Sequence, residues 1–419
     1  MTSAADAPVL DPQRIRELFD LRASYNGLRG GAYEEDPYPI WHRLREEAAV
    51  HPGVVHELTG LDAPATFHGL PEPDRPHFSA FTYEACDHAY RNDELFASSA
   101  DAVDLKTGEL ALTNSLLSMG GAQHRRYRGL VQPSFVPAKA EWWIRNWIQR
   151  TVRVLIDRLA EDGGAELNVD FCAAIPVLTI TGSFGVPVDK ALDIRAALTN
   201  PAAVVEVIKP IVAARRDAPQ DDLISVLVEA ELTDEEGVHH RLTDPEIYSF
   251  ALLLLAAGSG TTWKQLGITL TALLQRPDVL RAVRDDRSLL RAAIEESVRW
   301  APTDPMFSRW VTQDTDVLGI DLPKGAVLHI CLGAANRDPL RWERPDDYDI
   351  LRPLKPSLAF GSGPHVCLGM HVARAEMAVG IGALLDRLPN LRLDPDAEPP
   401  RIIGMYERGA MEIHVIWDG

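Results

Sequence analysis

Apolar residues recur at helical spacing along most of the chain. Four segments carry this pattern: PQRIRELFDL, PIWHRLREEAA, KAEWWIRNWIQRTVRVLIDRLAE and PDVLRAVRDDRSLLRAAIEESVRW. Alternating or β-branched positions, which indicate strands, are fewer and occur in HFSAFTY, FSRWVT, AVLHICL and MEIHVIW. We find no internal repeat and no clear linker. The pattern therefore predicts one mainly α domain over residues 1–419, with a small β component.

One helix can be placed from its boundary signals. The segment TDPE, Thr243 to Glu246, is a capping box with a proline in the first turn. The apolar run that follows ends before Pro277, which predicts a helix of about 30 residues, long enough to cross a domain. Its middle reads Gly258-Ser259-Gly260, a combination that favours a kink. Close helix packing and a bulky group lying against the helix both explain these residues.

Composition limits the possible partners and the compartment. The 419 residues are 46% hydrophobic, which is ample for a large core. Lys and Arg number 42 against 61 Asp and Glu, and the resulting charge of −19 argues against nucleic acids and anionic membranes as partners. The N-terminus lacks a signal-peptide pattern, and the longest apolar stretch is shorter than the ~20 residues of a membrane span. We expect a cytoplasmic protein without membrane insertion.

The cysteines are four and widely spaced, at positions 86, 172, 331 and 367. The absence of a C-x-x-C pair argues against structural zinc and against a disulfide framework. Cys86, Cys172 and Cys331 suit the ordinary role of a small buried apolar residue.

Cys367 differs because it lies in the glycine-rich loop FGSGPHVCLG, directly before a helical pattern. A thiol at a helix start meets free N–H groups and the positive end of the helix dipole, and both favour the thiolate. Gly361 and Gly363 permit unusual backbone angles and close approach to a flat partner.

This loop resembles the haem-binding loop of the cytochrome P450 family, with Phe360, Gly363, Cys367 and Gly369 at the family's spacing. The resemblance implies the P450 fold, with haem b (iron protoporphyrin IX) between a long distal helix and a proximal helix that starts at the cysteine. Cys367 would be the axial thiolate of the iron. Phe360 would shield its sulfur, and Gly363 and Gly369 would leave room for the ring.

Further motifs follow the family's order, so the resemblance covers most of the chain. The segment Glu296-Ser297-Val298-Arg299 resembles the Glu-x-x-Arg pair, which would form a structural ion pair; Arg344 and Arg352 are both candidates for its third partner. His124 and Arg128 match an H-x-x-x-R pattern on a helix across one haem face. The implied haem-propionate ligands are His124, Arg128, Arg309 and His365.

The distal helix carries the implied oxygen chemistry. Thr261 matches the family's oxygen-activating threonine, and Thr262 follows it. Gly260 stands where many members have an acid, so no carboxylate enters the proton relay from this position. The hypothesis is that Gly260 weakens proton delivery or that the substrate supplies a polar group. A tentative substrate pocket comprises Leu254, Ala257, Gly258, Met306 and Phe307, with Asp304 as a polar contact. Core packing explains Met306, Phe307 and Asp304 equally well.

The resemblance implies a haem-thiolate monooxygenase that oxidises a lipophilic small molecule with dioxygen. Electrons would come from a ferredoxin and its reductase, and we expect a monomer. The segment between Gly185 and Asp221 has fewer residues than the family's two lid helices, which predicts a shortened lid and an opening wide enough for a carrier-tethered substrate. The alternatives are oxidative coupling or ring closure, a peroxide-driven reaction, or a haem binder without turnover.

Overall fold

The computed structural model describes residues 10–61, 74–99, 115–233, 237 and 239–419. Its α-helices are α1 (Pro12–Leu18), α2 (Ser24–Leu28), α3 (Tyr38–Glu47), α4 (Val55–Leu58), α5 (Tyr83–Arg91), α7 (Gly121–Val131), α8 (Ala140–Trp143), α9 (Gln149–Leu159), α10 (Ala174–Ser183), α11 (Ala191–Ala197), α12 (Pro201–Asp217), α13 (Leu223–Glu229), α14 (Asp244–Gly260), α15 (Thr262–Leu274), α16 (Pro277–Asp285), α17 (Leu289–Trp300), α18 (Leu332–Ala335) and α19 (Met370–Arg387). Within this part of the chain, no single helix is both long and apolar enough to cross a membrane.

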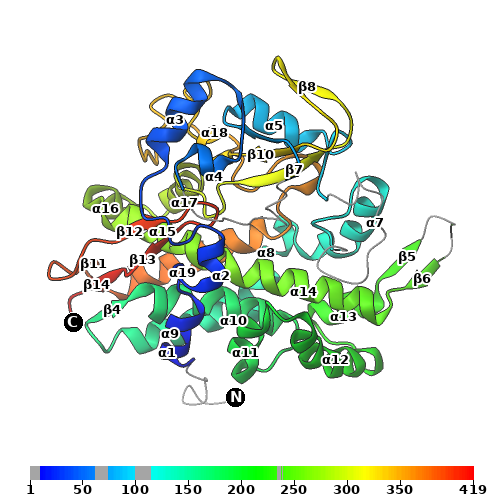
Figure 1. The fold of residues 1–419 in the computed structure, drawn as a ribbon. Coiled ribbons are helices and arrows are strands. Elements are labelled where there is room, and N and C mark those ends of the chain that lie inside the picture. Colours follow the sequence, from blue (N-terminus) through cyan, green and yellow to red (C-terminus); the bar gives the residue numbers. More distant parts are fainter. Residues whose placement is uncertain (1–9, 62–73, 100–114, 234–236, 238) are drawn as a thin grey trace.

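Strands form one larger sheet and several small ones. The larger sheet has the order β1-β2-β10-β7-β3, and only its β2–β10 pair is parallel. Its strands are β1 (Val50–Pro52), β2 (His77–Ala80), β10 (Val327–Ile330), β7 (Phe307–Val311) and β3 (Phe96–Ala97). The small sheets use β4 (Gly164–Glu166), β5 (Glu231–Thr233), β6 (His239–Arg241), β8 (Thr315–Val317), β9 (Ile320–Leu322), β11 (Arg392–Leu393), β12 (Arg401–Ile403), β13 (Gly409–Met411) and β14 (His414–Ile416). The larger sheet lies with α3, α5 and α18 at one end of the molecule, and the long helices fill the other end (Figure 1).

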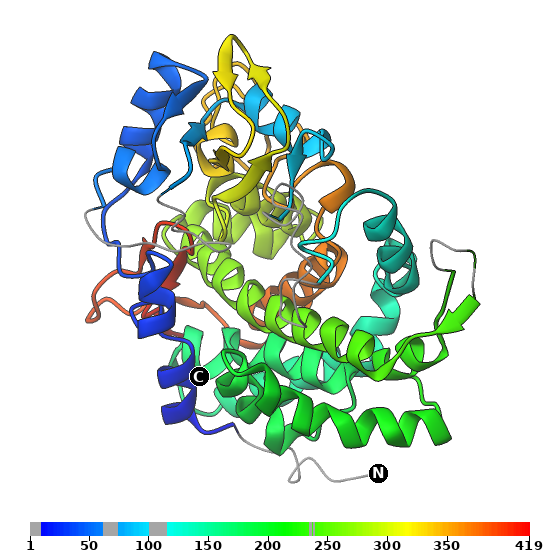
Figure 2. The ribbon, with the colours of Figure 1, turned by 45° about the vertical axis from the view of Figure 1, so that its right-hand side comes forward.

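The predicted 30-residue helix forms as two helices, α14 and α15, which follow one another across the middle of the molecule (Figure 2). The capping box is present: Thr243 and Glu246 bond one another's backbone N–H groups. The break falls at Thr261, the cap residue between the two helices. Gly258 is explained by packing, because a Cβ there would lie 2.7 Å from Cγ1 of Ile180 on α10.

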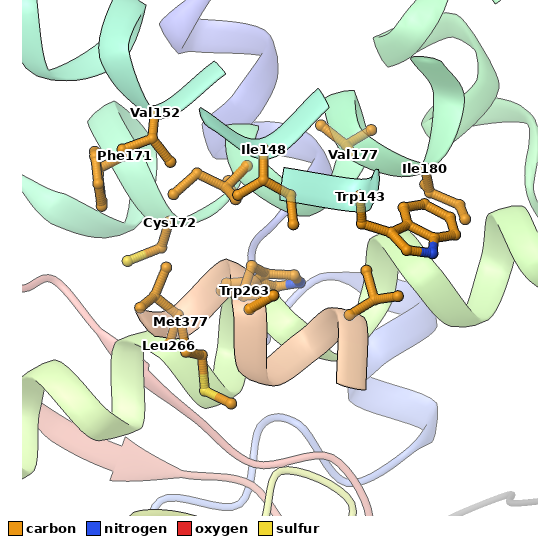
Figure 3. Close-up of a cluster of buried hydrophobic side chains, with 14 of the residues drawn as sticks. Trp143, Ile148, Val152, Phe171, Cys172, Val177, Ile180, Trp263, Leu266 and Met377 are labelled. Carbon is orange, nitrogen blue, oxygen red and sulfur yellow. The ribbon is translucent and has the colours of Figure 1, made fainter. Parts of the chain in front are cut away.

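The main core lies between α9, α10, α15 and α19. Figure 3 shows Trp143, Phe171 and Ile180 on one side and Trp263, Leu266 and Met377 on the other. Cys172 lies in this cluster and is fully buried, as are Cys86 and Cys331 elsewhere. Three of the four cysteines therefore have the packing role that the sequence predicts for them.

Three predicted helices have different boundaries in the structure. The segment 277–300 divides into α16 and α17, because the Asp286 side chain accepts the N–H of Ser288 and ends the first helix. The segment 139–161 contains a π-helical turn, Ile144–Ile148, between α8 and α9. The proximal helix α19 begins at Met370 and not at Cys367, so the prediction that it starts at the cysteine was wrong by three residues.

Two helices, α11 and α12, occupy the predicted short lid, and residues 198–200 join them. The N-terminal helix α1 braces the first of these, since Arg14 forms a 2.6 Å ion pair with Asp193. Arg195 reaches back from α11 to the Leu18 carbonyl and stacks on Phe19. The lid therefore consists of two helices with a tight link, held in part by the N-terminal segment.

Candidate active site

The loop from Phe360 to Gly369 is fixed by its glycines and by main-chain hydrogen bonds. Gly361 and Gly363 both have left-handed φ, near +70°. A Cβ on Gly363 would lie 2.5 Å from the carbonyl oxygen of Tyr90, so this glycine lets the loop approach α5 closely. The Cys367 N–H donates to the Phe360 carbonyl at 2.7 Å. These constraints hold the thiol just ahead of α19.

Cys367 is the exposed member of the four cysteines. Removal from bulk water raises the pKa of its thiol, while the Gly369 N–H and the nearby Arg128 and Arg374 guanidinium groups act in the opposite direction. The thiol is therefore partly accessible, poorly hydrated, and surrounded by groups that favour an anion. A bound cation would complete its conversion to thiolate.

Two histidines predicted to bind haem stack on each other. The rings of His124, on α7, and His365 lie 3.9 Å apart with planes 23° from parallel. Both ring nitrogens of the buried His124 lack a hydrogen-bond partner, and Nε2 of His365 lies 3.2 Å from the Ser98 hydroxyl. Burial lowers the pKa of His124 to about 4 and that of His365 to about 3. Both rings are neutral near pH 7.

The two arginines of the predicted set lie beside these histidines. Arg128 donates to the Val366 carbonyl at 2.7 Å, one residue before the thiol. Arg309, on β7, is buried over the ring of Tyr90, and its charge acts on His365. The Tyr90 hydroxyl has no hydrogen-bond partner. Unpaired buried donors are costly, so this set suits an anion that accepts from several of them.

The distal helix break presents two hydroxyls in different surroundings. Thr261 Oγ1 donates to the Ala257 carbonyl at 3.1 Å, and Ala257 is exposed although it lies inside α14. Thr262 is buried and hydrogen-bonds Glu376, a buried acid of α19 that also contacts Thr179. Burial raises the pKa of Glu376 to about 8. Sequence reasoning missed Glu376, although a lone acid on the apolar face of a helix is a usable signal.

The Glu-x-x-Arg motif forms a buried ion-pair network. Arg299 binds both carboxylate oxygens of Glu296, at 2.8 and 2.7 Å. Arg352 binds the same carboxylate at 3.1 Å, whereas Arg344 is exposed and pairs with Asp347 and Asp349. The structure thus selects Arg352 as the third member. Arg299 also donates to the carbonyls of Asn336, Pro345 and Asp347, which ties α17 to the segment before the cysteine loop.

The residues of the tentative pocket differ in burial and packing. Met306 is fully buried in a cluster with Trp41 and Cys331, which favours core packing, the alternative to a pocket role. Leu254 is buried as well, and Gly258 packs on α10. Phe307 is half-buried, with its ring edge against Tyr90. Asp304 is partly exposed within a buried charge cluster.

The residues around Cys367 fit one kind of group. A partly accessible thiol among cationic groups suits a metal ion, and unpartnered imidazole and phenol groups suit carboxylates. No heavy atom lies within 4 Å of where a Gly369 Cβ would be, so the loop leaves space beside the sulfur. Iron protoporphyrin brings both a metal ion and two carboxylates. Fold and site together define the class of haem-thiolate proteins.

Comparisons with known proteins support this assignment to the haem-thiolate class. A family model described as Cytochrome P450 matches residues 201–405. The cytochrome P450 monooxygenase PikC of Streptomyces venezuelae is 31% identical over 386 residues, which cover 88% of each chain. The chain belongs to the cytochrome P450 family and is a P450 oxidoreductase.

Solved structures extend the likeness over nearly the whole fold. The bacillaene polyketide synthase cytochrome P450 PksS of Bacillus subtilis 168 superposes with a TM-score of 0.80, at 25% identity, covering 94% of this chain and 99% of that one. P450BioI, solved in complex with an acyl carrier protein ligated to hexadec-9Z-enoic acid, has a TM-score of 0.75 at 26% identity, covering 91% and 99%.

Proposed function

We propose that this P450 is a monooxygenase that inserts one oxygen atom of dioxygen into a C–H or C=C bond of a lipophilic small molecule. The observation that carries the proposal is the Cys367 thiol, accessible in a glycine-held loop beside unpartnered buried donors. Bound haem b supplies the dioxygen chemistry, and a thiolate ligand favours O–O cleavage. The protein contributes binding, orientation and proton control around it, with the whole chain acting as one domain.

The roles of the site residues follow from their surroundings. Cys367 is the iron ligand, with Phe360, Gly363 and Gly369 shaping its loop. His124, Arg128, Arg309 and His365 bind the propionates. The two histidines are neutral before haem binds. On binding, each would gain a negatively charged propionate as a neighbour, which would raise its pKa.

Two further sets complete the proposed site. Glu296 and Arg299, with Arg352, hold the segment that leads to the loop and take no part in the chemistry. The hydroxyls of Thr261 and Thr262 pass protons on the distal side, at the helix break next to Gly260.

Electrons would come from a ferredoxin and its reductase in the cytoplasm. A carrier-bound acyl chain is a reasonable form of the substrate, because P450BioI binds such a chain and the lid helices α11 and α12 are joined by a short link. A peroxide-driven reaction is the second candidate. Gly260 supplies no carboxylate for proton delivery, and the peroxide route makes less demand on it. Turnover with hydrogen peroxide in the absence of reductase separates the two.

The first experiment is the absorption spectrum of the reduced protein under carbon monoxide. A strongly red-shifted Soret band is expected for the wild type and for Cys331→Ala, whose buried thiol is the matched control. Cys367→Ser should lose the shifted band. A wild-type band typical of a neutral ligand would refute thiolate ligation and with it the oxygenase proposal.

A further inference from the structure

Two consecutive acids on α17, Glu295 and Glu296, bind chain segments on either side of the cysteine loop. Glu296 binds Arg352, in the segment before the loop, at 3.1 Å. Glu295 instead binds Arg374, on α19 after the loop, through hydrogen bonds of 2.5 Å from Nε and 2.9 Å from Nη2. A paired contact of this kind fixes the direction of the guanidinium group as well as its place. Glu295 and Arg374 lie outside the Glu-x-x-Arg pair and outside the loop itself.

The Arg374 guanidinium also lies over the ring of Phe360, with Cζ 4.5 Å from the ring centroid. A cation over an aromatic face is attracted to it, and the flat guanidinium group is well suited to such a contact. The ion pair is half-buried, because the Arg374 side chain is 29% exposed and that of Glu295 is 23% exposed. Arg374 therefore contacts Glu295 through two nitrogens and Phe360 at the same time.

Phe360 is bonded to the ligand cysteine through the main chain. Its carbonyl accepts the N–H of Cys367 at 2.7 Å, and the N–H of the next residue, Gly361, donates to the Leu358 carbonyl at 2.8 Å. These bonds hold the backbone of Phe360 on both sides. Its side chain is half-buried beside the main core, so packing encloses the ring only in part and the Arg374 contact adds to its position.

We propose that Arg374 is a positioning residue that keeps Phe360 and the Cys367 loop in the arrangement that thiolate ligation needs. Glu295 holds Arg374 in turn, so that α17 fixes the loop from the side of α19. The inference rests on the proposed function, because it concerns the iron ligand. A thiolate ligand becomes a neutral thiol when it takes a proton from water, which leaves hydroxide. A loosely held ring and loop admit water more readily, so the ligand is then lost faster.

The first test measures how fast Arg374→Leu loses the thiolate ligand. The full-length, haem-loaded protein is reduced under carbon monoxide in a fixed, low concentration of urea, and conversion of the red-shifted Soret band to the band of a neutral ligand is followed. The rate should rise about two- to fivefold, the factor expected for loss of one cation–π contact. Arg287→Leu is the matched control, because it breaks a 2.7 Å ion pair with Asp386 at the other end of α19. It should convert at the wild-type rate.

A conservative variant separates position from charge. Arg374→Lys keeps the positive charge but lacks the planar group that binds a carboxylate through two nitrogens. Its conversion rate should lie between those of the wild type and Arg374→Leu, and a wild-type rate would overturn the positioning role in favour of charge alone. Glu295→Gln should raise the rate about twofold, because it removes only the ion-pair partner. If Arg374→Leu does not bind haem, Glu295→Gln takes its place in the first test.

A double-mutant cycle tests whether Arg374 acts through Phe360. Phe360→Leu should itself raise the conversion rate, since it removes the ring. Adding Arg374→Leu to that variant should change the rate little, because the contact between the two side chains is already gone. A merely destabilising effect of Arg374→Leu would multiply with that of Phe360→Leu. A further rise as large as the one in the wild-type background would therefore overturn the inference.

Two more outcomes would overturn the inference and leave the proposed function standing. Wild-type conversion rates in both Arg374→Leu and Glu295→Gln would show that this ion pair does not position the loop. A higher KM for ferredoxin in Arg374→Leu, with an unchanged conversion rate, would instead make Arg374 a contact for the electron donor. Absence of the red-shifted band in the wild type would be a failure of the proposed function itself, so the two failures are distinguishable.

Discussion

Replacing Glu376 by Gln should make the protein more stable at alkaline pH and change little near pH 5. Glu376 is 3% exposed, and burial raises its pKa to about 8 from an ordinary 4.5. Hydroxyls of Thr179 and Thr262 oppose the shift only in part. An amide of similar shape keeps a donor and an acceptor at this position but cannot ionise.

The direction in which stability changes with pH follows from proton linkage. Between pH 4.5 and pH 8 the folded protein keeps a proton on Glu376 that the unfolded chain has lost. The folded state binds more protons, so the free energy of unfolding falls as pH rises through this window. The difference between a pKa of about 8 and the ordinary 4.5 corresponds to about 5 kcal/mol, of which roughly 3 kcal/mol develops between pH 5 and pH 8. Glu376→Gln removes this slope.

The assay is denaturant unfolding of the wild type and Glu376→Gln, both loaded with haem, from pH 5 to pH 8. The difference between their free energies of unfolding is taken at each pH, so that the contributions of other titrating groups cancel. Glu246→Gln is a control of opposite sign. Burial raises the pKa of Glu246, but hydrogen bonds from Tyr127 and Thr243 outweigh it and leave the pKa lowered. That variant should therefore lose stability at neutral pH. A Glu376→Gln difference that is flat with pH would refute the burial argument.

Three further predictions concern the ion-pair network, the helix packing and the haem site. Glu296→Gln leaves the buried Arg299 uncompensated and should cost about 3–5 kcal/mol of stability, measured by urea unfolding; a cost below about 1 kcal/mol would contradict a buried network. Gly258→Val drives a Cβ into Ile180 and should cost about 1–3 kcal/mol, whereas Gly382→Ala, which has open space inside α19, is a control that should gain about 0.5–1 kcal/mol. Arg309→Leu should speed haem loss to an excess of apomyoglobin without abolishing the red-shifted carbon monoxide band, and retention equal to the wild type would argue against a propionate contact.

The sequence predicted those features that local chemistry determines. The capping box at Thr243 and the strands at 77–80, 307–311 and 327–330 depend on neighbouring residues and side-chain alternation, and all are present. Features that depend on tertiary packing were harder to predict from the sequence. The choice between Arg344 and Arg352 required the position of Glu296 in space, because both arginines lie in the same polar segment.

The buried role of Met306 also could not be read from the sequence. Its flanking residues suit either a pocket or a core, and only the packing of α3 in the same cluster decides between the two roles. Trp41 comes from that helix, more than 250 positions earlier in the chain, and lies in the same buried cluster as Met306. The same limit applies to Lys264, whose acidic partners come from segments 304 and 407.

Two acids, Glu376 and Asp304, have surroundings that stabilise a carboxylate to different extents. Glu376 accepts hydrogen bonds from two threonines, and no cation acts on it, so its carboxylate would form at high energetic cost. Asp304 has Lys264 and Arg29 to stabilise its carboxylate. The pH dependence of stability should therefore be stronger for Glu376 than for Asp304. Denaturant unfolding from pH 5 to pH 8 should accordingly show a larger pH-dependent gain in stability for Glu376→Gln than for Asp304→Asn, and the reverse order would contradict the stabilising effect of Lys264 and Arg29.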